Sequence, residues 1–237
     1  MKHLTTNKEQ FVHKLFTAIC SHYDFMNSML SCNQDRYWRR FALQKAELQP
    51  GNKVLDVCCG TGKLTLGLAA QVSPAGQVIG LDFCKAMLDI AEKNISKSPV
   101  KEVITLVQGN ALALPFPDNE FNCAITGFGL RNLPDINKAL AEMCRVTRPG
   151  GTVISLELAK PTAPVLKQLY YFYFEQILPL LGKLKVGADG FYSWLPQSLK
   201  DYPHQKDIAV IFENHGLSNV QYFELTGGIA AVHVGIK

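Results

Sequence analysis

Apolar runs and amphipathic segments alternate through the middle of the chain. Five short apolar runs have the length of buried strands and lie near residues 53–57, 77–82, 103–108, 122–126 and 152–158. Apolar positions at helical spacing separate them, near residues 62–72, 85–97 and 135–147. This alternation predicts an α/β fold with a parallel, doubly wound sheet.

The first fifty residues are predicted to be helical. The first helix should end where His22-Tyr23-Asp24 breaks a pattern whose apolar positions are Phe11, Leu15, Ala18 and Ile19. A second helix, basic and aromatic, is predicted from Asp35 to Glu47. Pro50-Gly51 then marks a turn before the first strand.

Residues 161–184 differ in composition from the rest of the chain, with five consecutive aromatic residues from Tyr170 to Phe174. Charged residues and a proline interrupt this run, which excludes a plain membrane-spanning helix. A helix covering the core is the simpler interpretation, and the alternatives are the wall of a hydrophobic substrate pocket or a patch on a membrane surface. Further on, Val220 to Lys237 predicts two strands joined through Thr226-Gly227-Gly228.

Composition limits the classes of function. The 237 residues and 47% hydrophobic content suit one α/β domain with a modest insertion. With 24 lysine and arginine residues against 20 aspartate and glutamate residues, the charge is too even to predict nucleic-acid binding. Seven scattered cysteines form no CxxC pair, and no signal peptide is recognised, so we expect reduced thiols in the cytoplasm and no metal site.

The stretch from Val54 to Asp82 carries the first chemical signal. An apolar strand ends at Asp56, a loop containing Gly60-Thr61-Gly62 follows, and a helix then leads to a second strand that ends at Asp82. Glycines let the backbone approach a ligand, and a helix start offers free N–H groups. A carboxylate at the second strand end can accept both ribose hydroxyls, so this βαβ unit predicts nucleoside binding.

Two residues decide which nucleoside is expected. A dinucleotide fingerprint requires Gly or Ala where this chain has Thr65. Asp56 at the mouth of the loop would repel a pyrophosphate but suits a cationic ligand, and S-adenosylmethionine carries both a sulfonium and an ammonium group. The closing hairpin also fits a methyltransferase sheet and does not fit a plain dinucleotide domain. We therefore predict S-adenosylmethionine, with Asp56, Gly60 and Gly62 at its site.

Two later loops are placed to complete the site. Gly109-Asn110-Ala111 follows the third strand, where an amide side chain and a backbone N–H can match an adenine edge. An ordinary loop asparagine is an equally good interpretation of Asn110 alone. The fourth strand ends in residues 126–132, where a methyl acceptor would face the donor. This loop lacks an NPPY-like sequence, which argues against methylation of a nucleobase amine.

Over nearly its whole length the chain resembles the ubiquinone/menaquinone-biosynthesis C-methyltransferases. The most particular segments are HYDFMN at 22–27, FGLRNLPD at 128–135 and YSWLPQS at 192–198. LDVCCGTG at 55–62 and TGGIAAVHVG at 226–235 look closer to the menaquinone-type members. GNALALPFPDNEF at 109–121, RVTRPGG at 145–151 and LELAKP at 156–161 also match. The resemblance implies methylation of demethylmenaquinol to menaquinol.

The resemblance also implies roles for particular residues. Donor-binding positions fall on Thr61, Asp82, Asn110 and Ala111, while Lys63 stands where relatives usually carry an acid. Catalytic candidates near the expected substrate mouth are Arg131, Tyr192, Asp24 and His233. Substrate-binding candidates are Tyr23, Asn27, Asn132 and Tyr202. Arg131 could stabilise a developing phenolate, whereas half-buried core packing is the simpler interpretation of each tyrosine and of His233.

These inferences combine into one expected architecture. We expect a class I S-adenosylmethionine-dependent methyltransferase fold, with a Rossmann-like, seven-stranded, mostly parallel sheet closed by an antiparallel hairpin. Its segments would be N-terminal helices (1–50), a donor-binding core (51–160), a helical substrate cap (161–215) and the hairpin (216–237). Peripheral contact with a membrane's inner face and homodimerisation are left open. The alternatives are a ubiquinone-type or dual-specificity benzoquinol enzyme, or a small-molecule methyltransferase of another class.

Overall fold

Seven strands form a single sheet in the computed structural model, which describes residues 2–172 and 189–237. The strand order is β3-β2-β1-β4-β5-β7-β6, in which β7 is antiparallel to β5 and β6 and every other neighbouring pair is parallel. The strands are β1 Lys53–Val57, β2 Gln77–Asp82, β3 Ile104–Gln108, β4 Phe121–Gly127, β5 Thr147–Leu158, β6 Ser218–Leu225 and β7 Ala230–Ile236. This arrangement confirms the expected fold class.

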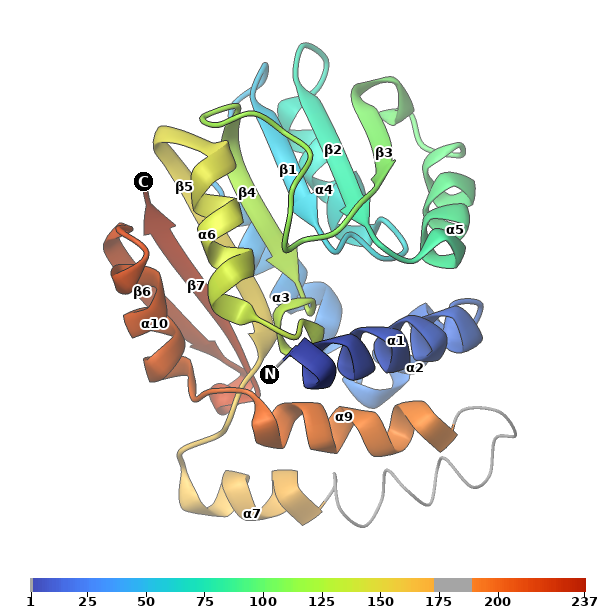
Figure 1. Cartoon of the computed structure of the whole chain (residues 1–237), viewed down its shortest axis with the longest axis vertical. Helices are drawn as coiled ribbons and strands as arrows, with labels where there is room; N and C mark the ends of the chain where they lie inside the picture. The colour runs from blue at the N-terminus through green and yellow to red at the C-terminus, as the bar shows by residue number, and fades with distance from the viewer. Residues whose placement is uncertain (1, 173–188) are drawn as a thin grey trace.

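Helices cover both faces of the sheet (Figure 1). Their bounds are α1 Lys2–Ile19, α2 Tyr23–Leu30, α3 Gln34–Lys45, α4 Lys63–Val72, α5 Lys85–Ile95, α6 Ile136–Val146, α7 Pro164–Phe172, α9 Asp189–Asp201 and α10 Gln205–Asn214. Apolar residues of α3 and α4 pack on one face, and those of α6 and α10 pack on the other. The segment 205–214 therefore lies against the sheet rather than with the rest of the predicted cap.

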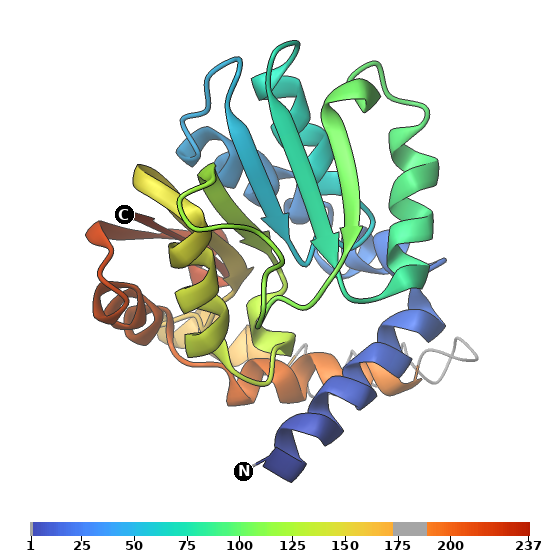
Figure 2. The ribbon, with the colours of Figure 1, turned by 45° about the horizontal axis from the view of Figure 1, so that its top comes forward.

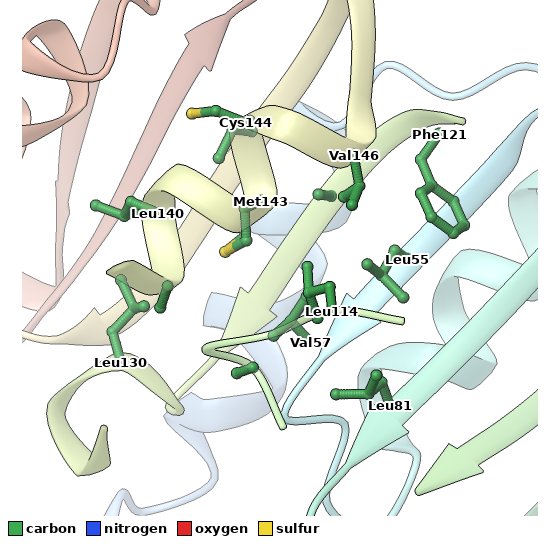
Figure 3. Packing of buried hydrophobic residues seen from close by; sticks show 14 of the residues in the cluster. Leu55, Val57, Leu81, Leu114, Phe121, Leu130, Leu140, Met143, Cys144 and Val146 are labelled. Atoms are coloured by element: carbon green, nitrogen blue, oxygen red, sulfur yellow. The ribbon is translucent and has the colours of Figure 1, made fainter. Parts of the chain in front are cut away.

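The alternation of side chains along β1 explains the two layers. Leu55 and Val57 point to the face covered by α6, where Leu140 and Met143 meet them (Figure 3). Val54, one residue away, points to the face covered by α4. Successive side chains of a strand point to opposite faces, so a strand that is apolar throughout needs a helical layer on each side.

The first helix is interrupted where the sequence indicated, since α1 ends at Ile19, but sequence reasoning missed the short helix α2. Tyr23 begins this helix, which runs to Leu30. The interruption lasts a single turn, closed by a hydrogen bond from the His22 N–H to the Ile19 carbonyl. Tyr23 and Met26 are buried on the same side of α2, and tertiary packing of these two residues stabilises a helix too short to stand alone.

Three helices lie across the carboxyl ends of the parallel strands (Figures 1 and 2). Val12 and Phe16 of α1 share a buried cluster with Met87 of α5 and with Leu195 and Leu199 of α9. These helices thus cover the edge of the sheet between β1 and β4, where the order of the strands reverses. In open α/β sheets this switch point is where ligands bind.

The aromatic run is only partly within the described residues. Its beginning belongs to α7, where Tyr170 is buried and Phe172 is exposed, and residues 173–184 lie outside the described part. In residues 2–172 and 189–237, no helix is both long and apolar enough to cross a membrane.

Candidate functional site

The loop between β1 and α4 turns sharply under the helix that follows it. Cys58, Gly60 and Gly62 all have positive φ angles, of 60°, 55° and 79°. The Cys59 N–H donates to the Leu81 carbonyl at 3.0 Å, which ties the loop to the neighbouring strand. At Gly60 and Gly62 the absence of a side chain removes the strain of this conformation, so the backbone can face the sheet edge closely.

Asp82, at the end of β2, holds that loop in place. One carboxylate oxygen accepts from the Gly60 N–H at 2.8 Å, and the other accepts from the Cys84 N–H at 2.9 Å. Burial raises the pKa of Asp82, while these backbone hydrogen bonds and the nearby His13 oppose the rise. Each carboxylate oxygen retains lone pairs that can accept a hydroxyl from a ligand.

A cavity opens beside Asp82, and we call it the loop cavity. Residues from the ends of β1, β2, β3 and β4 form its floor, and α1 and α2 close it from above. The lining residues are Glu9, Val12, Phe16, Tyr23, Cys58, Gly60, Leu81, Asp82, Phe83, Met87, Gly109, Asn110, Ala111, Gly127, Phe128, Gly129, Asn132, Leu133 and Pro134. Four of the seven predicted donor-binding residues line it: Gly60, Asp82, Asn110 and Ala111.

The amide of Asn110 is held by its neighbours. Its Oδ1 accepts from the Leu112 N–H at 2.8 Å, which forms a turn within the loop after β3. Its Nδ2 donates to Glu9 Oε1 of α1 at 3.3 Å. Asn110 therefore links the sheet edge to the covering helix as well as lining the cavity.

A second cavity, the helical cavity, lies between α2, α3, α7, α9 and the loop before β7. It has a volume of about 350 Å³, within the range typical of ligand pockets. Its lining is mainly apolar and consists of Asn27, Leu30, Ser31, Cys32, Gln34, Asp35, Trp38, Phe128, Arg131, Leu158, Tyr170, Leu195, Thr226 and Ile229. Phe128 lines both cavities and therefore separates them.

Phe128 has an unusual backbone. Its φ of 63° is strained for a bulky residue, and its carbonyl accepts from Arg131 Nη1 at 3.0 Å and Asn132 Nδ2 at 3.1 Å. The Arg39 guanidinium lies 5.1 Å from the ring centroid, and the Trp38 ring lies 6.2 Å away. These contacts hold the ring between the two cavities.

Arg131 is buried, although it is an arginine in a short 3₁₀ turn. Its side chain forms an ion pair with Glu157 of β5, and its backbone N–H donates to Glu157 Oε2 at 3.2 Å. Its Nε atom is buried and has no hydrogen-bond partner among the described residues. Arg131 also lines the helical cavity, so its guanidinium group lies beside that space.

Helices α1 and α9, which cover this edge of the sheet, both form hydrogen bonds to the turn that contains Arg131. Lys8 of α1 donates through Nζ to the carbonyls of Arg131 at 3.1 Å and Leu133 at 2.6 Å. Trp194 of α9 donates through Nε1 to Asn132 Oδ1 at 2.8 Å. The turn after β4 is therefore fixed by contacts from opposite ends of the sequence.

Helix α2 connects the two cavities to the glycine loop. Tyr23 lines the loop cavity, and Asn27, one turn later, lines the helical cavity. Between them, Asp24 Oδ1 accepts from Thr61 Oγ1 at 2.8 Å and lies 3.4 Å from Lys63 Nζ. The unusual Lys63 is thus neutralised by Asp24, and both Asp24 and Thr61 fasten α2 to the loop.

Three predicted donor residues lie beside or beneath the loop cavity instead of lining it. They are Asp56, Thr61 and Gly62. Asp56 is 1% exposed and accepts from Thr65 Oγ1 at 2.6 Å, and burial raises its pKa to about 7. The sequence predicted the Asp56 carboxyl at the mouth of the loop. It lies beneath the loop instead, because the last side chains of β1 are buried in the sheet.

Two predicted substrate-side residues lie away from both cavities. His233 of β7 is buried under α10, where its Nε2 lies 2.8 Å from the Gln205 carbonyl, and burial lowers its pKa to about 4. Tyr202 is buried among core residues next to α10, and burial raises its pKa. Both positions favour the core-packing interpretation. Tyr192 lies on α9, and its side chain falls outside the described part.

The cysteines and potential metal ligands form no further site. Burial raises the pKa of Cys58 and Cys59 well above the usual range, so both thiols are protonated and act as small apolar groups. Within residues 2–172 and 189–237, no three His, Cys, Asp or Glu side chains group in a way that could hold a metal ion.

Sequence reasoning missed several residues that shape the site. Phe128 and Glu157 lay within quoted motifs but received no role, since neither a ring between two glycines nor a strand glutamate signals function by itself. Glu9, Val12 and Phe16 were seen only as part of a helix. Their helical spacing could have indicated a buried face, but not which strand edge that face covers.

Comparison with known proteins places this geometry in a family. The model of the ubiE/COQ5 methyltransferase family matches residues 4–237. A protein named demethylmenaquinone methyltransferase from Bacillus licheniformis is 47% identical over 99% of this chain and 100% of its own length. One of the same name from Desulfitobacterium hafniense is 44% identical over 98% of this chain and 91% of its own length.

Solved structures share the fold at much lower identity. A SAM-dependent methyltransferase from Thermotoga maritima superposes with a TM-score of 0.65 at 17% identity, covering 94% of this chain and 99% of its own. Another from Aquifex aeolicus superposes with a TM-score of 0.62 at 19% identity, covering 84% of this chain and 88% of its own. With a family model matching almost every residue, the chain belongs to the ubiE/COQ5 methyltransferase family.

Proposed function

We propose that this protein transfers a methyl group from S-adenosylmethionine to a ring carbon of demethylmenaquinol. The observation that carries the proposal is the 44–47% identity, over nearly the whole chain, to proteins named demethylmenaquinone methyltransferase. The two adjoining cavities support it, because methyl transfer needs a donor site, here lined by Asp82 and Asn110, beside an apolar acceptor site.

The loop cavity fits S-adenosylmethionine. Asp82 would accept the two ribose hydroxyls through lone pairs that Gly60 and Cys84 leave free. Asn110 and Ala111 would contact the adenine edge, and Gly60 would let the backbone approach the ligand. Asp56, Thr61 and Gly62 would support the loop from outside the cavity. When bound, this group supplies an electrophilic methyl on a sulfonium.

The helical cavity fits the acceptor. Its apolar walls suit a prenylated naphthoquinol, whose reacting carbon would lie beside Phe128, next to the loop cavity. The Arg131 guanidinium would donate to a quinol oxygen, and Asn27 of α2 lines the same cavity. Tyr23 and Asn132 would limit the space on the donor side of Phe128.

The acceptor must be the reduced hydroquinol, since the ring carbon of a quinone is itself electrophilic. Loss of a hydroxyl proton moves electron density to the adjacent carbon, which forms the new C–C bond as the S–CH₃ bond breaks. The same carbon then releases its proton and the ring regains aromaticity. Arg131 would stabilise the phenolate, and the Tyr23 phenol, whose pKa burial raises, stays protonated and so does not act as the base.

The covering helices also suit contact with an anionic membrane that holds the prenyl chain. Exposed apolar side chains lie on three helices that line the helical cavity: Phe25 and Met29 of α2, Tyr37 of α3 and Phe172 of α7. Arg36 and Arg40, exposed on α3, supply positive charge beside them. Apolar insertion with nearby basic residues is the usual basis of peripheral membrane binding.

The first experiment is a product assay under reducing conditions. Purified protein with S-adenosylmethionine is offered demethylmenaquinol and the unmethylated ubiquinone precursor, and products are identified by mass spectrometry. We expect a product one methyl heavier from the naphthoquinol alone. Products from both quinols would make the enzyme dual, and methylation of neither, with S-adenosylmethionine binding intact, would refute the acceptor assignment.

Asp82→Asn is expected to weaken S-adenosylmethionine binding. Loss of hydrogen bonds to a charged acceptor costs about 1.5–3 kcal/mol, or roughly 10- to 100-fold in affinity. Isothermal titration calorimetry measures the change. Asp89→Asn, an exposed acid on α5, is the matched control and should bind like the wild type. An unchanged affinity for Asp82→Asn would remove Asp82 from the ribose site.

Asp56→Asn is expected to change the pH dependence of stability. The pKa of Asp56 is raised from 3.8 to about 7 in the folded protein, so its contribution to the free energy of unfolding falls as pH rises between these values. The variant lacks this titrating group. Its free energy of unfolding relative to that of the wild type should therefore rise by up to about 4 kcal/mol from pH 4 to pH 8.

Urea unfolding at each pH measures this difference. Asp207→Asn, an exposed acid on α10, is the control and should follow the wild type across the range. A difference between Asp56→Asn and wild type that does not vary with pH would show that Asp56 titrates normally.

The membrane proposal is tested by flotation with phosphatidylglycerol and phosphatidylcholine vesicles. We expect the wild type to float with the anionic vesicles and the Phe25→Ser/Met29→Ser double variant to stay behind. Val210→Ser removes an equally exposed apolar side chain from α10, away from the cavity, and should float normally. Equal flotation of all three proteins would argue against this surface.

A further inference from the structure

Glu157 occupies an unusual position for a glutamate. It lies on β5, one residue before the strand ends, and is 1% exposed. Its strand neighbours are apolar, with Leu156 fully buried and Ala231 of β7 directly opposite. A carboxylate at such a position is costly unless it is paired and hydrogen-bonded.

All the hydrogen bonds found for Glu157 concern the end of its own strand and Arg131. Its Oε1 pairs with Arg131 Nη1 and accepts from the Leu158 N–H at 2.8 Å, while its Oε2 accepts from the Arg131 N–H at 3.2 Å. Glu157 thus holds both the backbone and the side chain of a single residue. These contacts compensate the positive charge of Arg131, and they also fix the position of its guanidinium group.

The orientation of Arg131 follows from these contacts. Nη1 is engaged by Glu157 and by the Phe128 carbonyl at 3.0 Å, so that side of the guanidinium faces the strand ends. Nε is left buried without a partner among the described residues, on a side chain that lines the helical cavity. Without Glu157, the Phe128 carbonyl would be the one hydrogen-bond partner left to the guanidinium among the described residues.

The charge of Glu157 also influences groups that line the loop cavity. It contributes to the raised pKa of Tyr23, which lines the loop cavity, and to that of Cys58 in the glycine loop. A buried negative charge beside the Arg131 cation keeps the pair close to neutral overall. The acceptor site would otherwise contain an uncompensated positive charge.

We infer that Glu157 is a positioning residue for methyl transfer, which orients the Arg131 guanidinium toward the acceptor oxygen and sets the charge seen by that oxygen. The inference rests on the proposed function and deepens it. Glu157 acts through Arg131 and touches neither donor nor acceptor. Its effect should therefore appear in turnover and in the ionisation of the bound quinol, with little effect on S-adenosylmethionine affinity.

The test is a double-mutant cycle on the full chain with Glu157→Gln, Arg131→Gln and the double variant. For each protein, kcat and KM for demethylmenaquinol are measured across pH, and S-adenosylmethionine affinity is measured by calorimetry. We expect Glu157→Gln to lower the plateau kcat by 10- to 100-fold and leave donor affinity within twofold. In the double variant kcat should be within threefold of Arg131→Gln alone, because Glu157 has no target once Arg131 is gone.

The pH profile separates positioning from simple support of the fold. Removing the negative charge leaves a net cation near the quinol, which favours the phenolate, so the acid limb of the kcat profile should move to lower pH in Glu157→Gln. A role in stability alone would lower the plateau without moving that limb. Wild-type kcat in Glu157→Gln, multiplicative effects in the double variant or an unmoved limb would each overturn the inference.

Glu157→Asp covers the case in which Glu157→Gln does not fold. It keeps the charge but withdraws it from Arg131 by one methylene, and we expect an intermediate kcat with unchanged donor affinity. A wild-type kcat in this variant would overturn the inference. Failure of the wild type to methylate the quinol would instead refute the proposed function, so the two failures are distinguishable.

Discussion

The reversal of strand order at β1 is the constraint on which the rest of this structure depends. β2 and β3 lie on one side of β1, and β4 and β5 lie on the other, so their connections leave the sheet in opposite directions. At the carboxyl edge this opens a crevice that no crossover helix fills. The glycine loop, Asp82, Asn110 and Phe128 all lie at this edge because each ends or follows one of the parallel strands β1 to β4. Helices α1, α2 and α9 then cover this crevice, which contains the loop cavity and the helical cavity.

Phe128 is the residue that lines both cavities. Its strained backbone places it between the cavity that holds the Asp82 carboxylate and the cavity that holds the Arg131 guanidinium. A strained backbone conformation of this kind persists only where several surrounding contacts hold it in place. Here the surroundings include the Arg131 and Asn132 side chains, which bind the Phe128 carbonyl, together with Lys8 and Trp194, which hold the same turn. The geometry of transfer is thus set by a rigid turn on the scaffold and not by a free loop.

Buried charges are compensated differently beside the helical cavity and beside the loop cavity. Arg131 and Glu157 are paired, so the acceptor side carries a directed donor with little net charge. On the donor side, Asp82 is held by two backbone N–H groups, and Asp56 beneath it has a pKa near neutrality because one hydroxyl partner does not offset its burial. A cationic donor placed above these two carboxyls would restore the balance, which is consistent with the proposed ligand.

The sequence by itself determined the strands, the approximate bounds of α3, α4, α5 and α6, the closing hairpin and the residues of the glycine loop and Asp82, because strand burial and turn chemistry are local properties of the chain. It could not determine how deeply each candidate side chain is buried. Asp56, Tyr202 and His233 read as site candidates, yet packing of later elements buries them away from the cavities. The partners of Arg131, Asp24 and Asn110 come from segments 26, 37 and 101 residues away along the chain. Only tertiary structure decides such contacts, because they depend on how helices cross the sheet edge, and no local pattern encodes that crossing.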